Sequence, residues 1–293
     1  MRRRCAGWVN GALGTRAHRQ SITISSPARG PVMTTAAIVQ ARSTQFQDKD
    51  LILQSLGEKT ALIRVLDRCA RIAGVDQVIC TIPESEVETQ LALEILRNGH
   101  LLSVGPDSDP LSDLTHAVED YGVETVVLVS AASPFIDPGI CAKVLELYDS
   151  ASADYACNTM PALFPRGLEC EVFPAVLAAE ANRIAREDYA REDATLWMRE
   201  HVYLQKANLR GPGGGLESLN WMVSNQAQLD QARLLFDELG EAAGEASAAE
   251  LAALCLRRPD LSGEISEAAG EGNPVAHLRA DIESAVASLK IAA

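Results

Sequence analysis

The chain has 293 residues, 47% of them apolar, which is enough to fill a sizeable core in one large domain with appendages. Its 26 lysines and arginines face 40 aspartates and glutamates, and the net charge of −14 argues against nucleic acid or an anionic membrane surface as a general partner. No apolar run approaches the roughly 20 residues that a membrane-spanning helix needs.

The cysteines show how the chain uses its thiols. The seven cysteines form neither a CxxC pair nor a zinc-type spacing, and most of them lie in apolar segments. Reduced thiols of cytosolic proteins have this distribution, so we expect a cytoplasmic protein without disulfides.

The first 32 residues differ in composition from the rest of the chain. Residues 1–32 contain six arginines and no lysine, aspartate or glutamate. They are interpreted either as an Arg- and Ser-rich transit peptide or, as we favour, as a leader that is not translated, with Met33 as the natural start. Both interpretations exclude residues 1–32 from the folded domain.

From Met33 onward, predicted strands and helices alternate. Apolar runs of strand length fall at 36–41, 75–82, 101–104 and 126–129, and helical periodicity at 60–72, 87–95 and 112–121. This order predicts an α/β fold with a doubly wound, mostly parallel sheet that is covered on both faces. Right-handed crossovers then place the loops after the first and fourth strands at the same carboxyl edge, where ligands collect.

The loop after the first predicted strand carries residues suited to phosphate. Arg42 and Lys49 stand near the hydroxyl of Ser43, and charge-assisted hydrogen bonds to phosphate oxygens are strong. The loop lacks the glycines and the spacing of a P-loop, so a solvated connection is the alternative interpretation.

The loop after the fourth predicted strand differs in charge from the loop after the first. The stretch VLVSAASPFIDP, from Val127 to Pro138, runs from a strand into small neutral residues before a turn at Asp137 and Pro138. The centre of this predicted binding loop therefore carries no charge.

Several stretches resemble the cytidylyltransferase family that includes the acylneuraminate and deoxy-octulosonate enzymes, above all its spore coat polysaccharide biosynthesis protein F branch. They keep the family's order over about residues 36–262: IVQARSTQFQDKD and the segment after it, VSAASPFIDP, ADYACNT, FPRGLECEVF, REHV and LNWMVSNQAQLDQARLLFDEL. The resemblance implies a Rossmann-like nucleotidyltransferase fold over residues 33–240. An Ala-, Gly- and Glu-rich stretch after residue 240, and apolar residues at roughly heptad spacing after Pro274, predict a helical C-terminal extension over residues 241–293.

The resemblance also implies a reaction and its ligands. Family members transfer CMP from CTP to an acidic or modified sugar with Mg²⁺ and release pyrophosphate. They often dimerise through a projecting arm, so a homodimer is one candidate assembly. The residues implied for nucleotide binding are Gln40, Arg42, Ser43 and Lys49, and those implied for the substrate are Ser133, Glu169, Glu171 and His201. The two glutamates have an exposed strand face as their alternative interpretation, and His201 a structural role.

Two positions depart from the family's pattern. The family has one carboxylate for magnesium in the turn before Pro134 and another in a later segment, whereas this chain has Ala132 and Ser224 there. Because magnesium is normally held by one or two carboxylates beside the substrate phosphates, we assign neither metal ligands nor catalytic residues. Asp107, Asp109 and Asp113 are candidates to replace the missing carboxylates.

Two hypotheses therefore remain open. The chain is either a divergent CTP-dependent sugar activator of surface polysaccharide or nonulosonic-acid metabolism, or a non-catalytic nucleotide- or sugar-binding or scaffold pseudoenzyme. The two hypotheses differ in whether the chain catalyses the transfer of CMP.

Overall fold

The computed structural model describes residues 34–42, 50–86, 89–107 and 109–262. The leader predicted over residues 1–32 lies outside these ranges. The part of the predicted extension beyond Ser262 also lies outside them, and the boundary proposed after residue 240 stays a prediction.

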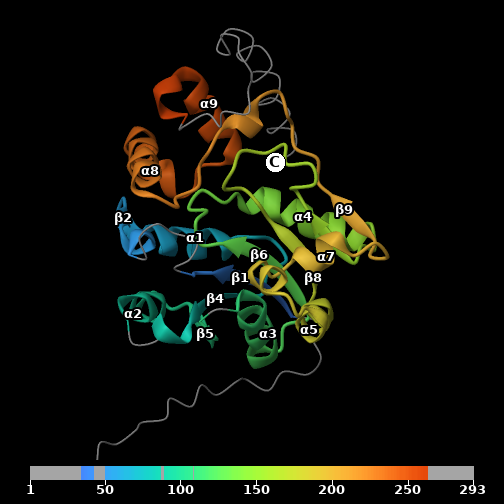
Figure 1. Ribbon diagram of the computed structural model, residues 1–293. Coiled ribbons are helices and arrows are strands. Elements are labelled where there is room, and N and C mark those ends of the chain that lie inside the picture. Colours follow the sequence, from blue (N-terminus) through green and yellow to red (C-terminus); the bar gives the residue numbers. More distant parts are fainter. Residues whose placement is uncertain (1–33, 43–49, 87–88, 108, 263–293) are drawn as a thin grey trace, which may run out of the picture. The chain divides into compact units, whose positions relative to one another are not determined.

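A mixed, mostly parallel sheet forms the centre of the described chain (Figure 1). In spatial order its strands are β5 (Leu101–Gly105), β4 (Gln77–Pro83), β1 (Thr35–Gln40), β6 (Thr125–Ser130), β8 (Glu171–Pro174), β7 (Tyr155–Cys157) and β9 (Lys206–Asn208). β8 runs antiparallel to both of its neighbours, and the other neighbouring strands pair in parallel. The predicted fold class is confirmed. A separate two-stranded ribbon joins β2 (Ser55–Leu56) to β3 (Lys59–Thr60).

Helices cover the sheet. Within the described residues they are α1 (Ala61–Cys69), α2 (Gln90–Arg97), α3 (Pro110–Tyr121), α4 (Pro138–Ser150), α5 (Ala175–Ile184), α6 (Asp188–Glu192), α7 (Leu196–Glu200), α8 (Gln226–Leu239) and α9 (Ala248–Arg257). The side chains of Thr60 and Asp109 each accept a backbone N–H in the first turn of the helix that follows, which fixes where α1 and α3 begin. None of the helices in the described ranges is both long and apolar enough to cross a bilayer.

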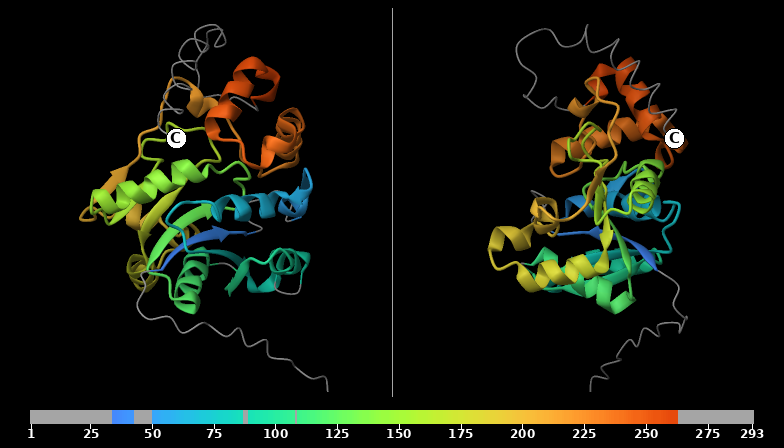
Figure 2. Two further views of the ribbon diagram at one scale, coloured as in Figure 1. Left: turned by 180° about the vertical axis from the view of Figure 1, so that it is seen from behind. Right: turned by 90° about the vertical axis from the view of Figure 1, so that its right-hand side faces the viewer.

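The central strands are buried on both faces. Ala37 and Val39 of β1 point into one core cluster, and Ala36 and Ile38 into the other. α1 and α4 contribute to the first cluster, and α3 and α5 contribute to the second. Figure 2 shows these two pairs of helices on opposite sides of the sheet. This burial explains why β1 and β6 appear in the sequence as continuous apolar runs.

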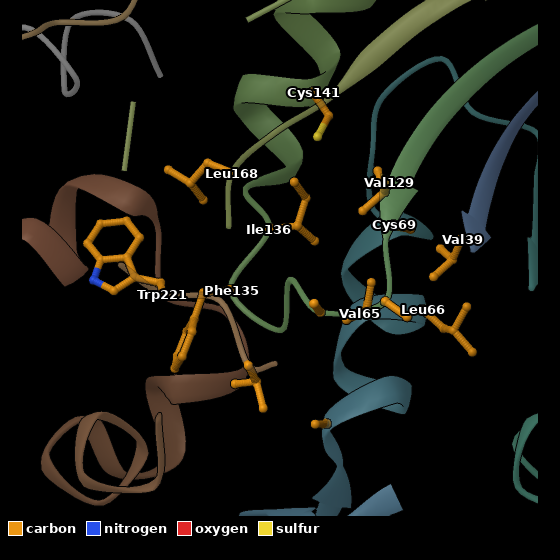
Figure 3. Close-up of a cluster of buried hydrophobic side chains, with 14 of the residues drawn as sticks. Val39, Val65, Leu66, Cys69, Val129, Phe135, Ile136, Cys141, Leu168 and Trp221 are labelled. Carbon is orange, nitrogen blue, oxygen red and sulfur yellow. The ribbon is translucent and has the colours of Figure 1, made fainter. Parts of the chain in front are cut away.

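The C-terminal helices belong to the first of these cores. Phe236 of α8 packs against Phe135 with ring centroids 5.4 Å apart, and Leu251 of α9 is fully buried in the same cluster. Trp221, which precedes α8, lies in this cluster together with Phe135 (Figure 3). Ser247 and Glu250 form the capping box predicted at the start of α9. The C-terminal region is therefore helical, as expected, and it packs on the sheet layer as far as Leu261.

The strand register defines the edge where a ligand site is expected. Gln40 at the end of β1 lies opposite Ser130 at the end of β6, and Leu128 lies opposite Glu171 at the start of β8. β1 has β4 on one side and β6 on the other, so the strand order reverses at this point. A doubly wound sheet binds ligands in the crevice outside the strand ends at such a reversal.

Candidate functional site

Two of the residues predicted to bind the nucleotide, Gln40 and Arg42, lie at or just after the end of β1. The side-chain amide of Gln40 donates to the carbonyl oxygen of Pro110 at 2.9 Å. The guanidinium of Arg42 forms an ion pair with Asp113 and donates to the carbonyl oxygens of Asp107 and Pro106, the latter at 3.3 and 3.4 Å. Burial lowers the pKa of Arg42 below its ordinary value, although Asp109 and Asp107 act in the opposite direction. The phosphate role of Gln40 and Arg42 stays a prediction.

The other two predicted nucleotide residues, Ser43 and Lys49, lie outside the described residues. Their roles likewise stay predictions.

The loop after β6 is tied to the segment that precedes α8. The hydroxyl of Ser130 accepts the N–H of Ala132 at 3.2 Å, and the carbonyl of Ala132 accepts the N–H of Val223 at 2.8 Å. This second hydrogen bond ties Ala132, one of the two positions where the family has carboxylates, to the residue that precedes Ser224, the other position. Ser133 is fully buried, and its hydroxyl has no hydrogen-bond partner among the described residues. Its role toward a substrate stays a prediction.

The chemistry of these two positions does not fit an ordinary magnesium site. Ala132 offers a methyl group, and the hydroxyl of Ser224 donates to Oε1 of Gln228 at 2.7 Å. The N–H of Ser224 donates to the same oxygen at 2.8 Å, which fixes the serine against the first turn of α8. Among the described residues, no group of three or more His, Cys, Asp or Glu side chains is arranged to hold a metal ion.

The three aspartates considered as replacement ligands are each engaged elsewhere. Asp107 accepts the N–H of Ser85 at 2.8 Å, and this hydrogen bond lowers the pKa of its carboxyl. Asp109 caps α3 and pairs with Arg191, whose Nε lies 2.8 Å from the carboxylate. Asp113 is fully buried against Arg42, as described above.

Glu169 and Glu171 are the two glutamates predicted to contact the sugar. Glu169 accepts the N–H of Gly167 at 2.7 Å, and burial raises the pKa of its carboxyl. Glu171 lies 3.5 Å from the guanidinium of Arg199 in α7, and burial raises its pKa as well, with Tyr155 among its neighbours. Glu171 therefore lies at the carboxyl edge of the sheet, partly shielded from solvent. Contact of either glutamate with a sugar stays a prediction.

His201 directly follows α7 and lies in a row of aromatic rings. Its ring centroid is 4.7 Å from that of Trp197 and 5.9 Å from that of Tyr203. Its backbone N–H donates to the carbonyl of Trp197 at 3.0 Å. The predicted substrate role of His201 stays a prediction.

The arginines that organise this edge could not be predicted from the sequence. Arg199 belongs to the REHV segment, but the sequence does not indicate its ion pairs with Glu171 and Asp193. The same holds for Arg191 and its contact with Asp109. A basic residue has many candidate acidic partners in a chain with 40 acidic side chains, so the sequence offers no signal that selects the right one.

These features define an α/β protein of the nucleotidyltransferase type. The chain belongs to the family described as the MobA-like NTP transferase domain, whose model matches residues 37–201. A curated relative, an uncharacterized protein of Methanocaldococcus jannaschii, is 24% identical over 174 residues, which span 59% of this chain and 70% of the relative.

Solved structures show the same fold. A cytidylyltransferase from Leptospira borgpetersenii serovar Hardjo-bovis superposes with a TM-score of 0.74 at 18% identity, over 80% of this chain and 99% of that one. A CMP:2-keto-3-deoxy-manno-octonic acid synthetase complexed with CTP gives a TM-score of 0.52 at 13% identity, over 70% and 99%. The predicted nucleotidyltransferase fold is thereby confirmed, and the family shown for the chain is that of the MobA-like NTP transferase domains.

Proposed function

We propose that the carboxyl edge of this sheet binds CTP and an acidic or modified sugar. The chain is then a divergent cytidylyltransferase of surface polysaccharide or nonulosonic-acid metabolism. Its ancestral reaction converts CTP and a sugar to a CMP-sugar and pyrophosphate. Family membership and the likeness to a cytidylyltransferase structure support this proposal.

One observation on the loop after β6 supports the proposal independently of family membership. A hydrogen bond runs from the N–H of Val223, the residue before Ser224, to the carbonyl of Ala132. It supports the proposal that Ala132 and Ser224 border one site, where their side chains supply a methyl group and a hydroxyl that is already hydrogen-bonded.

The chemistry of the ancestral reaction makes this replacement important. A sugar hydroxyl attacks the α-phosphorus of CTP, its proton leaves, and the bond between the α- and β-phosphates breaks to release pyrophosphate. Negative charge develops on the phosphate oxygens, and a metal ion and basic groups normally stabilise it. Since Ala132 and Ser224 lack the carboxylates that would hold magnesium, we expect this chain to transfer CMP slowly.

On the sugar side, Glu169 and Glu171 are the proposed contacts. Burial raises the pKa of both carboxyls above the ordinary value, so each holds a proton more tightly than an exposed glutamate would.

The second candidate is a non-catalytic protein that binds the nucleotide or the sugar, or serves as a scaffold. The neutral side chains of Ala132 and Ser224 favour it, because they leave the fold intact while removing the carboxylates that would hold the metal.

Calorimetric titration of CTP into the full chain tests both candidates, first with magnesium and then with a chelator, and with GTP as the control for base selectivity. Binding that strengthens at least about tenfold with magnesium supports the enzyme and justifies a screen of acidic sugars for pyrophosphate release. Binding that is indifferent to magnesium supports the non-catalytic protein. Absence of CTP binding in both conditions overturns the nucleotide site.

A further inference from the structure

Arg42 was predicted to hold a phosphate, but its surroundings indicate another task. The side chain is 3% exposed, and its guanidinium meets the carboxylate of Asp113 and the carbonyl oxygens of Pro106 and Asp107. Its described contacts thus reach from the end of β1 to the β5–α3 connection, which we define as Pro106, Asp107 and Asp109, and to α3 itself.

The fit around Asp113 depends on the residue at the end of β5. Gly105 lies so close to α3 that a Cβ atom added to it would be 2.7 Å from the Cα of Asp113. Real Cβ atoms do not approach other atoms this closely, so a side chain at position 105 would push Asp113 out of its place. The absence of a side chain at Gly105 lets the buried carboxylate of Asp113 reach Arg42.

The β5–α3 connection is also held from other directions. Arg191 of α6 contacts the Asp109 carboxylate, and the N–H of Ser85 donates to Asp107. The connection lies beside the carboxyl end of β1, because β5, β4 and β1 are successive parallel strands. It therefore borders the crevice where the nucleotide is proposed to bind.

The charges around Arg42 argue against a contact between its guanidinium and a nucleotide phosphate. Asp113 neutralises the guanidinium directly, and Asp107 and Asp109 lie close enough to act on it electrostatically. A phosphate that approached Arg42 would have to displace a buried carboxylate and would meet two more. Separating a buried ion pair is costly, because it leaves one charge in the interior without a partner.

We propose that Arg42 is a positioning residue that locks the β5–α3 connection and α3 to the end of β1, and that its partner is Asp113 rather than a nucleotide phosphate. This inference deepens the proposed function. Its binding test rests on that function, and its structural test does not.

Two variants separate the lock from a phosphate contact. Arg42→Lys keeps the positive charge but loses the planar fork that serves Asp113 and two carbonyls at once. Asp113→Asn removes the neutralising charge and leaves Arg42 in place. A phosphate contact predicts that Asp113→Asn tightens CTP binding, whereas the lock predicts that both variants weaken it.

The measurements are hydrogen exchange of the peptide from Val104 to Asp113 in the ligand-free chain, and the Kd for CTP. We expect both variants to speed exchange in this peptide and to weaken CTP binding, each by about tenfold, as for the loss of one charge-assisted hydrogen bond. The matched controls are Arg183→Lys and Glu180→Gln, which alter an exposed arginine–glutamate pair of α5 and should change neither quantity.

Gly105→Ala provides an independent test, since it leaves both charges in place and displaces Asp113 sterically. It should reproduce the faster exchange even if one of the charge variants fails to fold. The lock is overturned if exchange stays at the wild-type rate in the folded variants, or if Asp113→Asn tightens CTP binding. If the wild-type chain does not bind CTP, the proposed function fails, and hydrogen exchange alone still decides the lock.

Discussion

Asp137 and Ala248 are 111 residues apart in the chain, and the backbone N–H of Ala248 donates to the carboxylate of Asp137 at 2.7 Å. The other oxygen of this carboxylate accepts the N–H groups of Gly139 and Ile140 at 2.8 and 3.1 Å. Ala248 opens α9, while Gly139 and Ile140 belong to the first turn of α4. One side chain therefore caps two helices and joins the loop after β6 to the C-terminal region.

Replacing Asp137 tests how much this joint stabilises the protein. Asp137→Ala removes the cap of α4 and leaves the buried N–H of Ala248 without an acceptor. We expect a loss of about 2–4 kcal/mol in the free energy of unfolding, which is the sum of a helix cap and an unsatisfied buried donor. Urea denaturation measures it. The exposed Asp149, at the other end of α4, provides the control, since Asp149→Asn should stay within about 0.5 kcal/mol of wild type. Equal effects of the two variants would contradict the double-cap interpretation.

Arg68 of α1 also joins the loop after β6 to the C-terminal region. Its guanidinium is 1% exposed and donates to the carbonyl oxygens of Ile136, Gly244 and Ala246 at 2.6, 3.0 and 2.6 Å. Arg68→Met leaves these carbonyls without their charged donor, and we expect it to cost at least about 3 kcal/mol.

The neighbouring Arg71 is the control for Arg68. It also reaches Gly244, at 3.1 Å, but it is 37% exposed and pairs with an exposed glutamate. Arg71→Met should cost less than about 1 kcal/mol in the same urea titration. A loss as small for Arg68→Met would show that Arg68 does not hold the C-terminal region to the β6 loop.

The burial of Glu171 predicts how the stability of the fold depends on pH. Burial raises the pKa of its carboxyl above the ordinary value, so the folded state binds this proton more tightly than the unfolded state does. The stability that Glu171 contributes is therefore fully present below its unfolded pKa and is lost as the pH rises through the folded pKa. Glu171→Gln cannot ionise, so its stability relative to wild type should improve as the pH rises from about 4 to about 7.

Glu180 provides the control of opposite sign. It is exposed, and a hydrogen bond from Arg183 lowers the pKa of its carboxyl. Glu180 therefore contributes stability above its unfolded pKa and loses it as the pH falls. Urea titrations of both Gln variants should show slopes of opposite sign relative to wild type, above about pH 4 for Glu171→Gln and below about pH 4 for Glu180→Gln. A flat or reversed slope for Glu171→Gln would contradict the effect of burial.

Restoring the two carboxylates is the most direct prediction about activity. The double variant Ala132→Asp, Ser224→Asp returns carboxylates, the oxygen ligands that protein magnesium sites use, to both positions. We expect the affinity for CTP to gain a magnesium dependence of at least about tenfold, and the variant to release pyrophosphate in the presence of an accepted sugar.

The single variants Ala132→Asp and Ser224→Asp are the controls for the restoration, and each should gain less than the double variant does. Thermal melting must first show that the double variant folds, because Ala132 is 1% exposed. A folded double variant that binds CTP without magnesium dependence would show that these two positions do not form the metal site.

The long apolar strands could be predicted from the sequence, and the short ones could not. β1, β4 and β6 are buried on both faces, and this burial leaves runs of valine and isoleucine that are visible in the sequence. β7 and β9 have three residues each, too few to show a period, and pairing with neighbours far away in the chain defines them. The antiparallel direction of β8 likewise follows from its place between β6 and β7.

The candidate site was predictable in its position and not in its contacts. The order of strands and helices places Gln40 and the loop after β6 at one edge, and the structure agrees. The partner of Arg42 is an aspartate 71 residues away, and it fits there because Gly105 has no side chain. The sequence shows the charge of Arg42 and the absence of charge at Ala132, but packing decides which charges meet.

The contacts of Arg68 also set an order of events during synthesis. Ala246 follows Arg68 by 178 residues, so at about 5–20 residues per second the ribosome adds it roughly 10–35 s later. Throughout that interval the guanidinium has to stay hydrated, and the loop after β6 lacks the segment that closes over it. The strands β1, β4, β5 and β6 can therefore be in place early, while the cover over Arg68 is completed only after nearly the whole described chain has been made.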